Sequence, residues 1–142
     1  MFINERVKEL DVLLEGGHFN AAFVLSIIGI ELLGALEDDK PLRADKQSFK
    51  RFRLGVRRFF DKKYGRLEII DTLYKAVRCN VSHLGLKGGK CVFVETSFEH
   101  LVFEDLSLQI NKEQFINDYI KALKKCKTKI DSGLISLKKG LI

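Results

Sequence analysis

The segment from Leu73 to Gly85 holds the residues with the clearest chemical use. Within it, Arg78 and His83 stand five positions apart near the predicted end of a helix. Arginine offers a permanently charged planar fork that fits phosphate oxygens, and histidine exchanges a proton near neutral pH. The pair suits cleavage of RNA, whose 2′-hydroxyl is a built-in nucleophile. Arg78 would bind the phosphate and His83 would move the proton, without a metal ion.

Helix geometry restricts how these two side chains can meet. Five residues of a straight α-helix turn the chain by about 500°, which leaves the side chains about 140° apart around the axis. Either His83 lies beyond the last regular turn and swings back, or a second copy of the chain completes the pocket. We expect a homodimer.

Other chemical motifs are absent from the sequence. It contains no Walker loop, no GxGxxG, no HExxH and no GxSxG, so nucleotide hydrolysis, dehydrogenase and serine-hydrolase functions lose their usual support. Cys79 and His83 lie four residues apart and could share a metal with Cys91 or Cys126, but no second close ligand pair exists. We therefore expect no metal and no cofactor.

Composition and length favour one mostly helical domain over residues 1–142. Apolar residues make up 46% and charged residues 31% of the chain, and it contains one proline. The three cysteines form no CxxC pair, and Met1–Leu14 does not resemble a signal peptide, so we expect free thiols and a cytoplasmic protein. The apolar stretch Phe19–Leu36 carries several polar residues and predicts a buried core helix, not a membrane span.

Hydrophobic spacing predicts about five helices that must position the Arg78–His83 segment. They cover about residues 4–15, 20–37, 45 or 48–62, 67–83 and 112–137. Period-two alternation in 91–96 and 106–110 predicts a short two-stranded insertion at about 91–110, with a hairpin turning around 97–100. His18 and His100 fall in predicted loops and receive no role. Asn111 and Gln114 form a capping-box-like start for the last helix.

Positive charge is concentrated in one block of the chain. The net charge is +6, yet Arg43–Arg66 alone carries +8 and the remainder −2. Such a block is what a phosphate backbone would bind, and it includes the candidate RNA contacts Arg51, Arg53, Arg57 and Arg58. The alternative is that these residues form the solvated face of a helix.

The Arg78–His83 arrangement resembles the HEPN superfamily, whose signature is Arg, four to six residues, then His near the end of a long helix in a helical bundle. Arg78-Cys-Asn-Val-Ser-His83 satisfies the four-residue form. Active members often have Asn, Asp or His directly after the arginine, where this chain has Cys79, with Asn80 one residue further along. Members also often have an acidic or polar residue in the second helix that points at the cleft. By position, Glu31 or Ser26 is the candidate here.

The resemblance implies a metal-independent endoribonuclease that acts as a homodimer, with Arg78 and His83 as its catalytic residues. Toxin or defence roles are common in the family. Tyr74, one turn before Arg78, is expected in the core with its hydroxyl within reach of the same pocket.

Two alternatives stay open. The first is a non-catalytic module of the same fold that binds RNA or a nucleotide, or docks on an antitoxin or a nucleotidyltransferase-like partner. The second is a purely structural helical protein in which Glu31 and Arg78 form an internal ion pair, since a carboxylate among apolar neighbours needs a partner.

Overall fold

The computed structural model describes residues 2–79 and 90–138. Within them the helices are α1 (Phe2–Glu15), α2 (Phe19–Glu37), α3 (Ser48–Phe59), α4 (Leu67–Thr72) and α6 (Lys112–Asp131), and α4 continues directly into the π-helix η2 (Leu73–Arg78). Two 3₁₀ turns, η1 (Lys62–Tyr64) and η3 (Ser97–Glu99), and three short strands complete the described part. The protein is mostly helical, as the sequence predicts.

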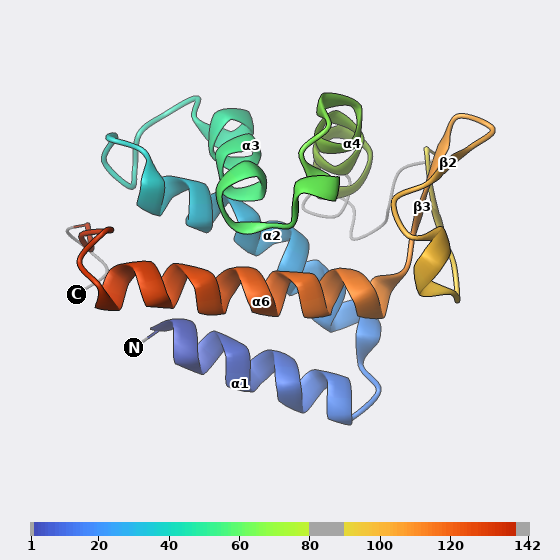
Figure 1. Cartoon of the computed structure of the whole chain (residues 1–142), viewed down its shortest axis with the longest axis horizontal. Coiled ribbons are helices and arrows are strands. Elements are labelled where there is room, and N and C mark those ends of the chain that lie inside the picture. Colours follow the sequence, from blue (N-terminus) through green and yellow to red (C-terminus); the bar gives the residue numbers. More distant parts are fainter. Residues whose placement is uncertain (1, 80–89, 139–142) are drawn as a thin grey trace.

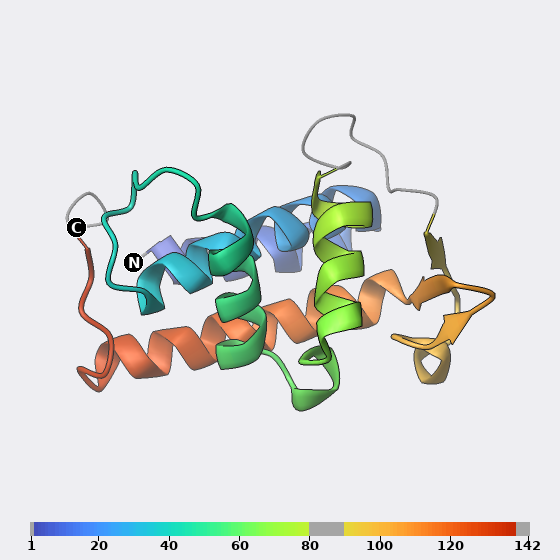
Figure 2. The ribbon, with the colours of Figure 1, turned by 90° about the horizontal axis from the view of Figure 1, so that it is seen from above.

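The helices form two crossing sets (Figure 1). α1 lies alongside α6, and α2 packs on α1, α3 and α6. Seen from above, α3 and α4 stand side by side across α2 and α6 (Figure 2). The small sheet extends beyond one end of α6, away from both termini. α2 is thus the central element of the bundle.

Two glycines let α2 and α3 cross closely. A Cβ atom on Gly34 of α2 would lie 1.8 Å from the carbonyl oxygen of Arg51, and one on Gly55 of α3 would lie 2.4 Å from the carbonyl oxygen of Ile30. Neither position has room for a larger residue. This close crossing fixes α3 against α2 and places Ser48, at the start of α3, beside Glu31 of α2.

α2 matches the predicted core helix and has nine buried residues. By length and composition alone it could also cross a membrane, but half of that span is buried inside the structure. The core helix of a soluble protein passes the same test, so this feature is weak evidence for a membrane span.

The helices α3 and α6 form where the sequence predicts them, but each ends earlier than predicted. α3 ends at Phe59, and the basic residues after it form η1. The Asn111 side chain caps α6 by accepting a hydrogen bond from the Gln114 backbone N–H at 2.8 Å. α6 ends at Asp131 instead of about residue 137, because Gly133 adopts a left-handed φ of 82° that ends the helix. The predicted end of the fourth helix, near His83, lies outside the described residues.

The predicted two-stranded hairpin around residues 97–100 is wrong. The sheet has three strands in the order β1-β3-β2: β1 (Cys91–Phe93) pairs in parallel with β3 (Ser107–Ile110), and β2 (Phe103–Glu104) pairs antiparallel with it. The hairpin instead joins β2 to β3 through Asp105 and Leu106. Alternation carries no information on strand direction, and a two-residue strand leaves no periodic signal.

Candidate functional site

Arg78 and Glu31 form an ion pair between η2 and α2. The Arg78 Nη2 donates to the Glu31 Oε2 at 2.8 Å, and about a fifth of each side chain is exposed. The sequence argument was that a carboxylate on an apolar helix needs a partner and that Arg78 could supply it, and the structure shows this pair. Of the two second-helix candidates, Glu31 is the one that contacts Arg78.

Ser48 and Tyr74 extend this pair into a four-residue cluster. The Ser48 hydroxyl donates to the Glu31 Oε1 and lies 2.7 Å from the Tyr74 hydroxyl. Since the single Ser48 proton goes to the carboxylate, Tyr74 is the donor in the second hydrogen bond. The Arg78 guanidinium also lies over the Tyr74 ring, 5.5 Å from its centroid. We call Glu31, Ser48, Tyr74 and Arg78 the Arg78 cluster.

A π-helical turn places Tyr74 and Arg78 in the cluster. The Cys79 backbone N–H bonds to the Tyr74 carbonyl five residues back, instead of four back as in an α-helix. The predicted fourth helix is therefore π-helical over Leu73–Arg78, while the geometry from Arg78 to His83 lies outside the described residues. Single π turns inside helices occur frequently at functional sites.

The electrostatics of the cluster keep Arg78 charged. Burial by itself lowers the pKa of the guanidinium, but the charge and hydrogen bond of Glu31 outweigh burial, so the pKa of Arg78 lies above its usual value. The Arg78 Nε is buried and has no hydrogen-bond partner among the described residues. Glu31 thus orients the guanidinium on one side, and no group among residues 2–79 and 90–138 accepts a hydrogen bond from its Nε.

A hollow of about 490 Å³ opens beside the cluster, between α2 and the loop that precedes α3. Glu31 and Ser48 line it, together with Leu32, Ala35, Leu42, Ala44, Asp45, Lys46, Gln47 and Arg51. Its volume is within the range that small ligands occupy. A group bound there would meet the Glu31 carboxylate and the Ser48 hydroxyl.

The remaining predicted site residues fall into three cases. His83 and Asn80 lie outside the described residues. Cys79 is half-buried next to Arg78. Ser26 is fully buried and its hydroxyl donates to the Ala22 carbonyl at 2.8 Å, so it cannot face an open cleft.

The four α3 arginines do not form one surface. Arg51 is buried: its Nε donates to Asp38 at 2.7 Å, and its terminal nitrogens donate to the carbonyls of Leu42 (2.8 Å) and Pro41 (2.7 Å). Its predicted contact with RNA is therefore corrected to a structural role, holding the 38–42 loop. It is buried because Gly34 brings its backbone against α2.

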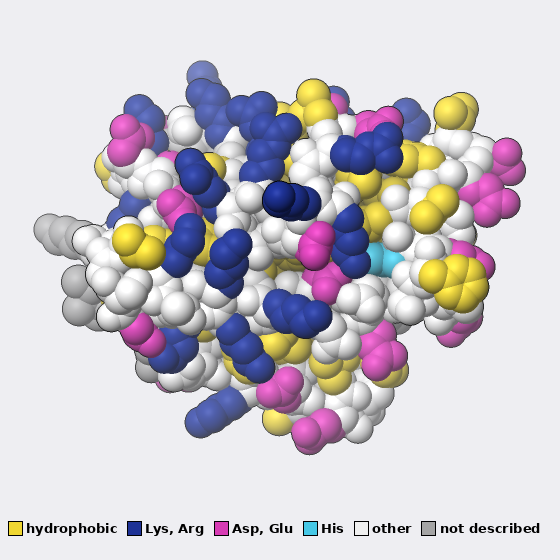
Figure 3. All heavy atoms as spheres, in the orientation of Figure 1, with side chains coloured by type: hydrophobic (Ala, Val, Ile, Leu, Met, Phe, Trp, Pro, Cys, Tyr) yellow, Lys and Arg dark blue, Asp and Glu magenta, His cyan; other side chains and the backbone are white. Residues whose placement is uncertain are grey.

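The other three arginines remain available for a surface role. Arg53 is half-buried, with its guanidinium 5.7 Å from the Phe49 ring centroid, while Arg57 and Arg58 are exposed. Neither exposed arginine has an acidic partner within the described part of the chain. Lys and Arg side chains gather over α3 and along the neighbouring length of α6 (Figure 3).

Two features escaped the sequence argument. The sequence predicts position 48 only as a possible start of the third helix. Nothing in the local sequence around Ser48 indicates its contact with Glu31, 17 residues earlier. His100, expected in a loop without a role, is buried: its Nε2 lies 2.7 Å from the Tyr64 hydroxyl, and its Nδ1 accepts from the Asn111 N–H at 2.9 Å. The Tyr64 hydroxyl in turn donates to Asp118.

The His100 network joins the sheet to the helical bundle and has a single protonation pattern. Because Tyr64 donates to Asp118 and Nδ1 accepts from a backbone N–H, His100 is neutral with its proton on Nε2. Burial lowers the pKa of His100 to about 4, although Asp118 opposes that shift. The Tyr64 hydroxyl links the His100 and Asp118 side chains through two hydrogen bonds, and the three side chains have a structural role.

Within residues 2–79 and 90–138, no group of three His, Cys, Asp or Glu side chains is arranged to hold a metal ion. Comparison of the chain with protein-family models, with curated proteins and with solved structures finds no match. The function is therefore argued from the Arg78 cluster itself.

Proposed function

We propose that this protein is a metal-independent endoribonuclease of the HEPN type, with Arg78 as the phosphate-binding residue and His83 as the acid–base residue. The observation that carries the proposal is the state of Arg78: its charged guanidinium is held in place by Glu31, and its buried Nε has no hydrogen-bond partner among the described residues. Arg78 also stands five residues before His83 in the sequence. The π-helical turn at Leu73–Arg78 supports the same assignment, since such turns are frequent at functional sites.

The chemistry requires only groups that the chain and its substrate supply. His83 removes the proton from a ribose 2′-hydroxyl, and the resulting oxygen attacks the adjacent phosphorus. Arg78 stabilises the negative charge on the crowded phosphate. The bond to the 5′-oxygen breaks and that oxygen takes up a proton, which leaves a 2′,3′-cyclic phosphate and a 5′-hydroxyl. A homodimer places two such sites close together, and the cytoplasm is the proposed compartment.

The test is cleavage of a mixed single-stranded RNA by purified protein in the presence of EDTA. We expect Arg78→Ala and His83→Ala to lower the cleavage rate by about 100-fold or more. Lys8→Ala and His18→Ala are control variants, because both residues are exposed and lie outside the Arg78 cluster and outside the basic block. Undiminished cleavage by Arg78→Ala or His83→Ala at equal purity would refute the proposal.

A second candidate function is favoured by one observation. Glu31 already neutralises Arg78, which weakens the pull of this arginine on a phosphate. Such a neutralised pair fits a non-catalytic module of the same fold, in which RNA or a nucleotide binds through other residues such as Arg57 and Arg58, or an antitoxin or nucleotidyltransferase-like partner docks. Salt-sensitive RNA binding without turnover by substoichiometric protein would select this function over the first.

A further inference from the structure

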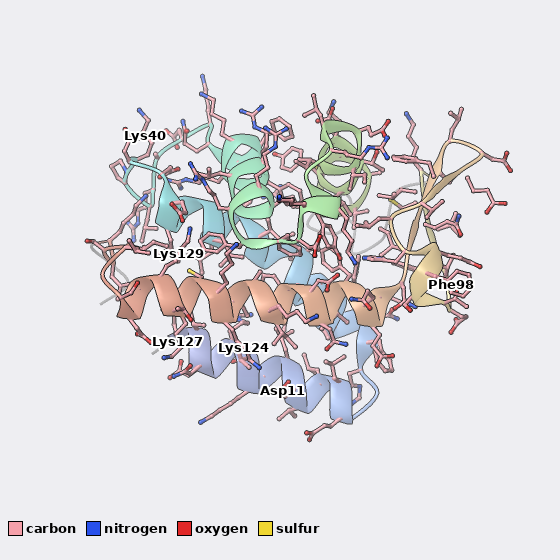
Figure 4. The ribbon with its side chains drawn as sticks, in the orientation of Figure 1. Asp11, Lys40, Phe98, Lys124, Lys127 and Lys129 are labelled. Atoms are coloured by element: carbon pink, nitrogen blue, oxygen red, sulfur yellow. The ribbon has the colours of Figure 1, made fainter. Side chains whose placement is uncertain are left out.

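The segment that carries the three-stranded sheet, residues 90–111, exposes large apolar side chains, and we call it the β insertion. Val92, Phe98, Val102 and Leu106 are all exposed, Phe98 to 81% and Leu106 to 88%. Phe98 lies at the far end of the molecule on η3 and points away from the bundle (Figure 4). In the space-filling view, apolar and acidic side chains alternate down this end (Figure 3). Phe98 and Leu106 contact so little of the rest of the protein that their side chains add little to its stability.

Leu106 is also held in an unfavourable backbone conformation. The β2–β3 hairpin turns through Asp105 and Leu106, whose φ angles are 48° and 65°. Two-residue hairpin turns often require positive φ, and Gly or Asn normally supplies it. A leucine in this region is strained. The chain therefore presents a large apolar side chain at the most exposed point of the hairpin, where glycine would fit better.

The charge of the insertion limits what can bind there. Residues 90–111 contain one lysine and four acidic residues, a net charge of −3, whereas the whole chain carries +6. The acidic residues are Glu95, Glu99, Glu104 and Asp105. A phosphate backbone or an anionic membrane surface would be repelled. A protein partner with an apolar pocket surrounded by Lys or Arg side chains would complement the apolar and acidic side chains of the insertion.

We propose that the β insertion is a docking surface for a protein partner of this kind, with Leu106 and Phe98 as its anchors. Within the described residues neither α3 nor α6 exposes a large hydrophobic side chain, so these two helices of a second copy do not match the surface. The hollow beside α1, lined by Arg6, Lys8, Val12 and Leu13, is the face of a second copy that the sedimentation experiment below tests. The surface is separate from the Arg78 cluster, so this inference does not depend on the ribonuclease assignment.

The test uses the full chain and two synthetic helical peptides, one of Leu and Lys and one of Leu and Glu. By NMR titration we expect the Leu/Lys peptide to bind saturably and to shift the resonances of residues 92–106. Leu106→Gly should weaken this binding at least tenfold while the melting temperature stays equal or rises, since glycine relieves the positive φ. Phe98→Ser should also weaken it. Leu134→Ser, which removes an exposed leucine beyond α6, should leave it unchanged.

The proposal would be overturned by no binding of the Leu/Lys peptide, equal binding of the Leu/Glu peptide, shifts confined to other surfaces, or a lower melting temperature for Leu106→Gly. A lower melting temperature for Leu106→Gly would mean that the Leu106 side chain stabilises the fold. Concentration-dependent self-association that Leu106→Gly abolishes, measured by sedimentation, would also overturn it by identifying a second copy as the occupant.

Discussion

Arg78 and Glu31 are 47 residues apart in sequence, yet their side chains form an ion pair at 2.8 Å. The pair joins η2 to α2, and Ser48 from α3 donates to the same carboxylate. Three helices therefore meet at one charged group. Because the Glu31–Arg78 pair joins three helices, it should stabilise the folded state as well as orient Arg78.

Glu31→Gln should destabilise the fold by about 1–3 kcal/mol, because a partly buried guanidinium loses its counterion. Denaturant unfolding of Glu31→Gln, Arg78→Met and the double variant would give the coupling energy. We expect the double variant to be more stable than the sum of the single effects predicts. Strict additivity would show that the ion pair contributes nothing.

Ser48→Ala should cost more than Tyr74→Phe. The Ser48 hydroxyl donates to a carboxylate, and its removal should cost about 1.5 kcal/mol, whereas the neutral hydrogen bond from Tyr74 is worth about 1 kcal/mol. Urea unfolding midpoints of both variants measure the difference. The reverse order would mean that the proton assignment in the cluster is wrong.

His100 should make stability depend on pH between about 6.5 and 4. Burial lowers its folded-state pKa to about 4, below the usual 6.5, so the unfolded chain binds the proton first. The stabilisation is complete above about pH 6.5 and is lost as the pH falls through 4, by about 3 kcal/mol in total.

The check is to compare the unfolding free energy of the parent chain and His100→Gln across this pH range. The difference between them should shrink on acidification. His18→Gln, which changes an exposed histidine, should follow the parent at every pH. A constant difference for His100→Gln would contradict the buried neutral histidine.

Gly34→Ala should disrupt the α2–α3 crossing. The new Cβ would lie 1.8 Å from a backbone oxygen, which cannot rotate away, so we expect a loss of about 3 kcal/mol or more. Gly65→Ala is the matched control, because its nearest neighbour would be 3.2 Å away. Thermal unfolding by circular dichroism distinguishes them, and similar melting temperatures would contradict the close packing.

Arg57→Gln combined with Arg58→Gln should weaken RNA binding and make it less sensitive to salt. Two lost phosphate contacts lower the slope of log affinity against log salt by roughly one to two. The measurement is a gel-shift series in a His83→Ala background, to prevent cleavage. Lys8→Gln on α1 is the control. An unchanged slope would mean that the two arginines are only a solvated helix face.

The mostly helical class, the buried core helix α2 and the Asn111 cap follow from the sequence, which also offered the Glu31–Arg78 pairing as one alternative. Each depends on local periodicity, or on the high cost of an unpaired charge on an apolar helix. The strand order was not predictable, because Phe103–Glu104 is too short to show alternation and parallel pairing leaves no mark on sequence. The burial of His100 depends on Tyr64 and Asp118, which are distant in the chain.

The sequence by itself indicated which residues could carry chemistry: the Arg78–His83 pair, the basic block and an acidic residue on an apolar helix. Only the tertiary structure decided how the described residues among them are arranged. Gly34 and Gly55 let two backbones approach, which buries Arg51 and brings Ser48 to Glu31. The π-helical turn aligns Tyr74 and Arg78. Close approach between distant segments depends on packing in three dimensions, which one-dimensional spacing does not encode.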